Sequence, residues 1–283
     1  MMSIVIGLSN ILAGLAYAGL GVLSAWETIS LHRYRGWSRF GIGFSLMAVS
    51  CGPHHLIHGW HVLQGASVSW PMLTATLIGL PAGLTFVYSR LEAACGGQGD
   101  RAIYASPQWV VLSVGILTLI AGWLAAWTLV QSSEVGSAFE ALCGSSGPIF
   151  GGGGLGIDVA CVDLLANVFV TITYGMVGWY LADHQARRYL TDGAWSLSGI
   201  ALSGVFFTCA QMHFVNAFTA GDEVRLVIDL IGVPASVYFL WIVKQVHNDS
   251  VLDWNRRPLV GTAGTPARRS PWSAESGSAE RPI

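Results

Sequence analysis

The sequence predicts an all-α integral membrane protein with seven transmembrane helices. Only 11% of the 283 residues are charged and 53% are hydrophobic, whereas about a quarter of the residues in a soluble domain are charged. A helix needs about 20 apolar residues to cross a bilayer. The lipid bilayer is therefore the first expected partner, and a net charge of −2 does not suggest nucleic-acid binding. Seven apolar runs meet the length, at about 4–25, 38–64, 71–89, 109–131, 159–181, 196–218 and 224–244.

The basic residues predict the orientation of the chain. The 14 Lys and Arg residues follow the first, third, fifth and seventh runs, except for Arg225 on the opposite side. Because cytoplasmic loops are enriched in Lys and Arg, we expect the N-terminus outside and the C-terminus in the cytoplasm, across a bacterial plasma membrane. The Pro-, Ser- and Gly-rich segment 248–283 is expected to be a disordered cytoplasmic tail. A disulfide between Cys143 and Cys161 is chemically allowed on the outer side.

The chain contains an internal duplication. Residues 37–55 and 195–213 align without a gap, and seven of the 19 positions are identical. Shorter matches precede and follow this block in the same order. The matched positions include Asn10/Asn167, Tyr17/Tyr174, Cys51/Cys209, His55/His213 and the blocks LIGLPA (77–82) and LIGVPA (230–235).

These matches predict a domain plan. Residues 1–92 form a first three-helix repeat and residues 158–247 form a second one. Residues 93–157 supply a linker helix with its flanking loops. Because a single linking helix gives both repeats the same orientation, the plan is a parallel 3+1+3 repeat.

A polar stripe marks the second run. Four of the chain's eight histidines fall within eight residues there, and at about 100° per residue five polar side chains share one arc of about 120°. Such a stripe should face a protein interior or a water-filled cavity rather than lipid. At about 1.5 Å per residue the stripe is roughly 15 Å long, which favours two sites or one site with an access path. The five residues are Cys51, His54, His55, His58 and His61.

The second copy of this element, CAQMHF (209–214), keeps the cysteine and one histidine and has Met212 in place of His54. Imidazole with soft sulfur ligands suits copper, especially Cu(I), whereas imidazole alone would also suit zinc or iron. Approaching from opposite faces, His55 and His213 could instead be the two axial ligands of haem b. A lone transmembrane histidine is more commonly a hydrogen-bond partner between helices.

Two carboxylates, Asp163 and Asp229, are expected at the level of the histidines in the outer part of the membrane. Carboxylates inside a membrane are costly and commonly functional. Asp229 could instead pair with Arg225 one turn away, Asp163 could be a hydrated interfacial residue, and the two cysteines could be packing residues. Solvated positions at the inner helix ends are expected for Glu27, His32, His184 and His247.

The stretches FFTCAQMHFVNAF (206–218) and MAVSCGPHHLIHG (47–59) resemble the repeated Met-His-Tyr-Thr element of the MHYT domain, a bacterial membrane sensor module. The resemblance covers these two stretches, neither of which has all four signature residues. It implies copper binding and sensing of a diatomic gas, and by position it nominates Met212 and His213, with His55 beside them. The 3+1+3 plan is also similar to SWEET-type transporters, at the level of the fold alone.

The leading hypothesis is a transition-metal site, most suited to copper, or a haem site near the outer face between the repeats, acting in sensing, redox or metal handling. His55 and His213 would be its central ligands. The second hypothesis is a small-solute, proton-coupled or metal transporter with the histidine stripe as its relay. The third is a membrane-bound metal-dependent enzyme. Further expected partners are other membrane proteins or a second copy of the chain. The candidate metal ligands are His54, His55, His58, His61, Met212, His213, Asp163, Asp229, Cys51 and Cys209.

Overall fold

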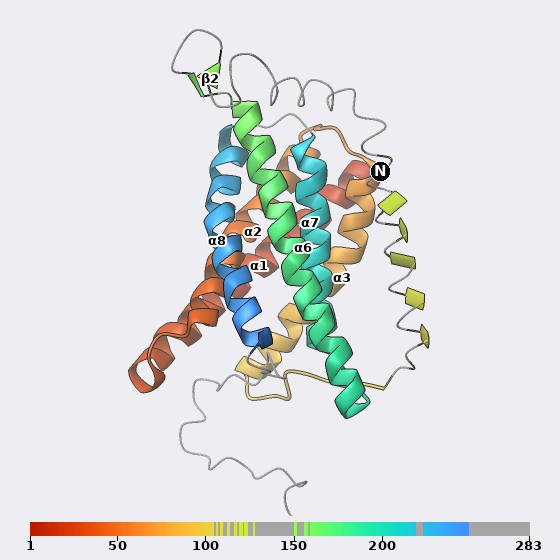
Figure 1. Cartoon of the computed structure of the whole chain (residues 1–283). Coiled ribbons are helices and arrows are strands. Elements are labelled where there is room, and N and C mark those ends of the chain that lie inside the picture. The colour runs from red at the N-terminus through yellow and green to blue at the C-terminus, as the bar shows by residue number, and fades with distance from the viewer. Residues whose placement is uncertain are drawn as a thin grey trace, which may run out of the picture.

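The computed structural model describes residues 1–104, 159–218 and 223–248, together with short stretches between 105 and 158. Six helices in this part of the chain are each long and apolar enough to cross a membrane, and they lie side by side as a bundle (Figure 1). The predicted membrane class is therefore confirmed. The helices are α1 (Met2–Arg35), α2 (Arg39–Leu63), α3 (Trp70–Ala94), α6 (Val159–Asp192), α7 (Leu197–Ala217) and α8 (Glu223–Asn248).

Several sequence predictions concern residues that the structure does not describe. The fourth run, at 109–131, falls mostly outside the described residues, as do Cys143 and the tail after residue 248. The side chain of Cys161 is also outside them. Four short strands complete the described elements and form two antiparallel pairs, β1 (Ala102–Ile103) with β4 (Trp195–Ser196) and β2 (Phe150–Gly151) with β3 (Gly156–Ile157).

Matched serines begin the second helix of each predicted repeat. The hydroxyl of Ser38 accepts a hydrogen bond from the Gly41 amide at 3.0 Å before α2, and that of Ser196 accepts one from the Gly199 amide at 3.0 Å before α7. A serine at this position pairs an amide that the helix itself leaves unpaired. Ser38 and Ser196 are aligned positions in the two halves, so both helices begin with the same serine capping hydrogen bond.

The helices of the two halves of the chain make the same set of contacts. Helix α1 packs on α2 and α3, and α6 packs on α7 and α8 in the same way. Across the two halves, α2 packs on α8 and α3 packs on α7. Exchanging the two halves leaves this list of contacts unchanged, as a pseudo-two-fold relation between them requires. The main hydrophobic core draws on both halves and includes Tyr17, Phe44, Tyr174, Phe206 and Phe239.

Helices α1 and α6 are longer than the sequence predicted. Each has 34 residues, or about 50 Å at 1.5 Å per residue, against a hydrocarbon core of about 30 Å. The expectation that Glu27 and His184 are solvated is wrong, because they are only 7% and 2% exposed. Both helices continue past the predicted ends and carry these residues inside the bundle, where Glu27 pairs with Arg90 of α3 at 2.7 Å.

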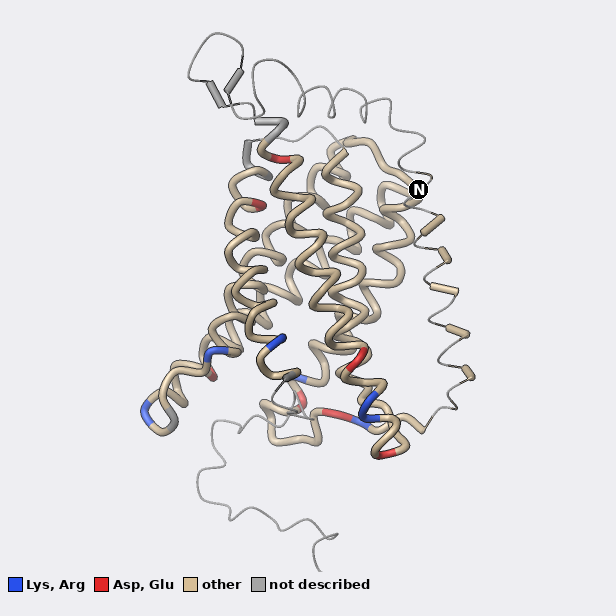
Figure 2. The backbone as a smooth tube through the Cα atoms, viewed as in Figure 1, with Lys and Arg blue, Asp and Glu red and all other residues tan. Residues whose placement is uncertain are grey.

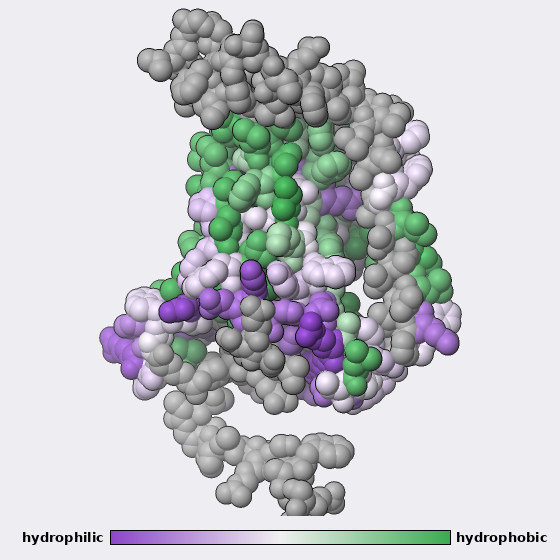
Figure 3. All heavy atoms as spheres, in the orientation of Figure 1, coloured by the Kyte–Doolittle hydropathy of each residue, from purple (hydrophilic) through white to green (hydrophobic). Residues whose placement is uncertain are grey.

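Charge is unevenly distributed along the bundle. Figure 2 shows the described Lys and Arg positions gathered at one end of the bundle, together with most of the acidic ones, while the N-terminus lies at the opposite end. Figure 3 shows a hydrophilic band over the charged end and apolar side chains above it. An apolar surface of this kind is expected to contact lipid.

Candidate metal centre

The centre is built around His54 of α2, which contacts both other helices of the site. Its Nδ1 lies 2.8 Å from Oδ1 of Asp229 on α8, and its Nε2 lies 3.1 Å from the amide nitrogen of Asn216 on α7. Because the Asn216 amide nitrogen can only donate, Nε2 of His54 accepts and Nδ1 carries the hydrogen that Asp229 accepts. All three residues are buried, so the imidazole is held from both sides.

His213 of α7 approaches the same carboxylate. Its Nδ1 lies 3.9 Å from Oδ1 of Asp229, and its ring centroid lies 4.5 Å from that of His54. The same Nδ1 lies 2.8 Å from Oδ1 of Asn167 on α6. Since the Asn167 amide nitrogen donates to Oδ2 of Asp229 at 2.9 Å, its oxygen is left to face His213. Asn167 therefore fixes the imidazole and the carboxylate at once.

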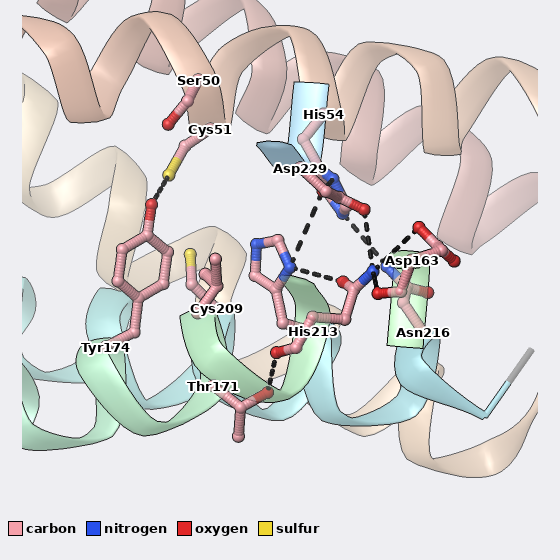
Figure 4. A network of polar contacts seen from close by, with 12 residues as sticks. Ser50, Cys51, His54, Asp163, Thr171, Tyr174, Cys209, His213, Asn216 and Asp229 are labelled. Atoms are coloured by element: carbon pink, nitrogen blue, oxygen red, sulfur yellow. Dashed lines mark hydrogen bonds and ion pairs between the residues drawn. The ribbon is translucent and has the colours of Figure 1, made fainter. Parts of the chain in front are cut away.

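His54, His213 and Asp229 form a group that could hold a metal ion. Each offers one ligand atom, and these atoms lie within 4.8 Å of one another. Ligand atoms that share one ion at bond lengths of about 2.0–2.2 Å lie roughly 3–4 Å apart, so small side-chain shifts would complete the coordination. Figure 4 shows the three side chains turned toward one another.

The centre lies toward one end of the bundle. His213 is close to the end of α7 at Ala217, and Asp229 is close to the start of α8 at Glu223. By the predicted orientation this is the outer half of the membrane. A buried ionised carboxylate is costly unless it is hydrogen-bonded or paired. Here the hydrogens of His54 and Asn167 satisfy Asp229 without an ion, and an ion would replace part of that network.

The structure places the other predicted ligands of the stripe elsewhere. Nδ1 of His55 lies 2.7 Å from Oδ1 of Asn10 on α1, so this imidazole is held on the side of α2 away from Asp229. Cys51 Sγ lies 3.0 Å from the hydroxyl of Tyr174 on α6. His58 is buried and His61 is half-buried, and the group formed by the described residues includes neither. Their role as ligands stays a prediction.

Asp163 contacts the centre through Asn167. Its carboxylate accepts a hydrogen bond from the Asn167 amide at 3.2 Å, and its carbonyl accepts one from the same group at 3.0 Å. It is 2% exposed, so it is not the hydrated interfacial residue that one sequence interpretation suggested. In this structure Asp163 supports Asn167 rather than joining the three-residue group.

Haem does not fit the cavities described beside His55 and the two cysteines. The spaces beside His55 and beside the central Cys51 and Cys209 measure about 10 and 20 Å³, enough for about one water each. A macrocycle sandwiched between the imidazoles of His55 and His213 would need far more room.

Sequence reasoning did not nominate the asparagines that orient the site. Asn167 orients His213 and Asp229, Asn10 orients His55, and Asn216 contacts His54. The signal was present, because Asn10 and Asn167 are matched positions that precede Tyr17 and Tyr174 at the same spacing.

The hydrogen bonds of the two halves also correspond. Asn10 contacts His55 at 2.7 Å as Asn167 contacts His213 at 2.8 Å. Edge-to-face ring contacts at 5.4 and 5.7 Å join Tyr17 to His55 and Tyr174 to His213. The matched pairs of the alignment therefore occupy matched positions around the bundle interior.

Comparisons with protein-family models, with curated proteins and with solved structures give no match for this chain.

Proposed function

We propose that this protein is a seven-helix membrane protein that binds a divalent transition metal reversibly at His54, His213 and Asp229, in metal handling or sensing. The observation that carries the proposal is the convergence of three buried ligand atoms within 4.8 Å of one another. Two imidazoles and one carboxylate suit zinc, iron(II) or copper(II). Metal-binding histidines commonly donate a hydrogen bond through their second ring nitrogen to an orienting acceptor, and Asn167 is such an acceptor for His213.

Reversible binding is supported by the way the ligands satisfy one another without an ion. His54 donates to Asp229 at 2.8 Å, and Asn167 donates to the second carboxylate oxygen at 2.9 Å. Structural zinc sites, by contrast, commonly leave the chain unfolded without metal. A centre that stays paired in the metal-free state can gain and lose its ion while the bundle stays folded.

The centre joins the two halves of the chain, which supports a signalling or handling role. His54 comes from α2 in the first half, whereas His213 and Asp229 come from α7 and α8 in the second. An ion held by all three would favour one packing of α2 against α7 and α8. A ligand that contacts two arrangements differently shifts the balance between them, so metal occupancy would be transmitted to the helix packing.

The proposal includes the parallel 3+1+3 plan and the orientation with the N-terminus outside. The exchange symmetry of the helix contacts supports the plan, and the gathering of basic residues at the end opposite the N-terminus supports the orientation (Figure 2). With this orientation the metal would be taken from the outer side. The transporter and enzyme alternatives stay predictions.

The proposal is tested with the full-length chain purified in mild detergent and stripped of metal. Dialysis against Zn²⁺ or Co²⁺ followed by elemental analysis should give about one ion per chain, and Co²⁺ should add visible absorption bands. The variants His54→Ala and His213→Ala should lose the ion. His32→Ala is the matched control, because His32 lies at the far end of α1 and contacts Trp37 with ring centroids 4.2 Å apart. Wild-type stoichiometry in both site variants would overturn the proposal.

A further inference from the structure

A second pocket is lined by residues that correspond, in the alignment of the two halves, to those of the metal centre. It is lined by Asn10, His55, Thr76, Cys209 and Met212, among others, and measures about 10 Å³. Each of its residues has a partner in the alignment of the two halves. His55 corresponds to His213, Asn10 to Asn167, Thr76 to Asp229 and Met212 to His54. This pocket, the twin pocket, therefore has the same frame as the metal centre but different donor atoms.

We propose that the twin pocket binds a soft monovalent cation, Cu(I), through His55 Nε2, Cys209 Sγ and the Met212 thioether. This site is separate from the divalent centre and does not depend on it. Thiolate, thioether and imidazole are the donors that select Cu(I) over harder ions. The carboxylate of the divalent centre is replaced here by the neutral hydroxyl of Thr76, which removes the ligand best suited to a harder cation.

The orientation of His55 prepares it for this role. The Asn10 amide nitrogen donates to the Ile6 carbonyl at 2.9 Å and contacts the Thr76 hydroxyl at 3.3 Å. Its oxygen therefore faces Nδ1 of His55 at 2.7 Å and accepts the hydrogen there. The lone pair of the imidazole is left on Nε2, as in metal-bound histidines that donate through the other nitrogen.

The sulfur atoms are placed to share an ion with that lone pair. Nε2 of His55 lies 3.9 Å from Sγ of Cys209. Bonds of about 2.0 Å to nitrogen and 2.3 Å to sulfur give such a separation at an angle slightly wider than trigonal. Met212 follows Cys209 by three residues on α7, which places both on one helix face, and both line the twin pocket.

Charge balance also favours a monovalent ion. Cys209 and Met212 are 5% and 3% exposed, so the site is enclosed and a net charge there would be costly. When Cu(I) binds, the S–H bond of Cys209 breaks, its proton leaves to solvent, and the thiolate neutralises the single positive charge. His55 and Met212 bind as neutral ligands. Copper keeps its oxidation state throughout, so the step needs no oxidant or reductant.

The test is an anaerobic competition between the full-length protein in detergent and the Cu(I) chelator bicinchoninate, followed by its absorption. Wild type should remove one Cu(I) per chain from the chelator. Cys209→Ser and Met212→Leu should each weaken Cu(I) binding at least tenfold, and X-ray absorption should show one sulfur ligand fewer in each. His54→Ala should bind Cu(I) as wild type does, while losing Zn²⁺.

Matched controls separate ligand loss from general damage. Cys95→Ser changes an exposed thiol, and Met47→Leu changes a buried methionine that lines the other cavity. Both should bind Cu(I) normally. Met212→Leu conserves volume, so it should keep the elution profile and Zn²⁺ binding of wild type. Three outcomes would overturn the proposal: no Cu(I) taken by wild type, wild-type affinity in both twin-pocket variants, or Cu(I) lost in His54→Ala.

Discussion

His54 on α2 and Asp229 on α8 meet across the bundle although 175 residues separate them in the chain, with Nδ1 of the imidazole 2.8 Å from Oδ1 of the carboxylate. They are 4% and 1% exposed. The contact joins the first half of the chain to the second and supplies two of the three ligand atoms of the proposed centre. Removing either partner should therefore affect both metal binding and stability.

The first prediction concerns the Asp229→Asn variant. It should bind Zn²⁺ at least tenfold more weakly, because the charged ligand is lost. Its free energy of unfolding should fall by about 1–3 kcal/mol, since the new amide group faces donors from His54 and Asn167 and leaves a buried donor unpaired. Zn²⁺ competition with a chelating dye and thermal unfolding in detergent measure the two effects.

The control is Asp163→Asn, which changes a second buried carboxylate that also contacts Asn167, at 3.2 Å. It should keep Zn²⁺ affinity within a few-fold of wild type. Equal losses in the two variants would mean that the carboxylates act together, contrary to the assignment of Asp229 alone.

The second prediction uses the matched asparagines. Asn167→Ala should lower Zn²⁺ affinity by about 10–100-fold, the usual effect of removing a group that orients a metal ligand. Asn10→Ala should leave Zn²⁺ affinity unchanged and weaken Cu(I) binding instead, because Asn10 orients His55. If Asn10→Ala reduced Zn²⁺ binding as strongly as Asn167→Ala, the two sites would not be separate.

The third prediction tests the close approach of α1 and α2. A Cβ on Gly59 would lie 2.7 Å from the Gly7 carbonyl oxygen and 3.0 Å from the Ile11 amide nitrogen, whereas one on Gly175 would meet nothing within 4 Å. Gly59→Ala should therefore cost about 1–3 kcal/mol of stability, and Gly175→Ala should be neutral or slightly stabilising. Thermal unfolding in detergent ranks them, and a Gly59→Ala variant as stable as Gly175→Ala would refute this packing.

The fourth prediction concerns orientation. Cys95 is exposed just after α3, on the side expected to be cytoplasmic. In a Cys143→Ser, Cys161→Ser variant, a membrane-impermeant maleimide should leave Cys95 unlabelled in intact cells or right-side-out vesicles and label it after lysis. Labelling of intact cells to the level of lysed ones would reverse the proposed orientation.

The sequence predicted the membrane class and three residues that the structure brings together, His54, His213 and Asp229. It succeeded because charged and imidazole groups are costly in hydrocarbon, so their presence in apolar runs was informative. It did not predict that the histidines of the polar stripe on α2 contact different neighbouring helices. An arc of about 120° spans more than one neighbouring helix, so His54 faces Asp229 of α8 while His55 faces Asn10 of α1.

Long-range pairing explains the other differences. The sequence suggested Arg225 as a local partner for Asp229, and the side chain of Arg225 lies outside the described residues. Among the described residues, Asp229 pairs with His54, from a helix far away in the chain. Glu27 looked like a solvated helix end, but it pairs with Arg90 of α3 at 2.7 Å. Hydrophobicity shows where an apolar run ends. It does not show how far the helix continues beyond that point when an adjacent helix supplies partners for its charged side chains.

The central claim, that His54, His213 and Asp229 from three helices bind one divalent ion, is tested most directly by X-ray absorption at the zinc edge. The sample is the full-length protein in detergent, loaded with one Zn²⁺ per chain. The account predicts a first shell of nitrogen and oxygen only, with the outer-shell scattering of about two imidazoles. His54→Ala, which loses the ion, should give no such zinc signal. A sulfur shell around zinc, or the same imidazole scattering in His54→Ala, would contradict it.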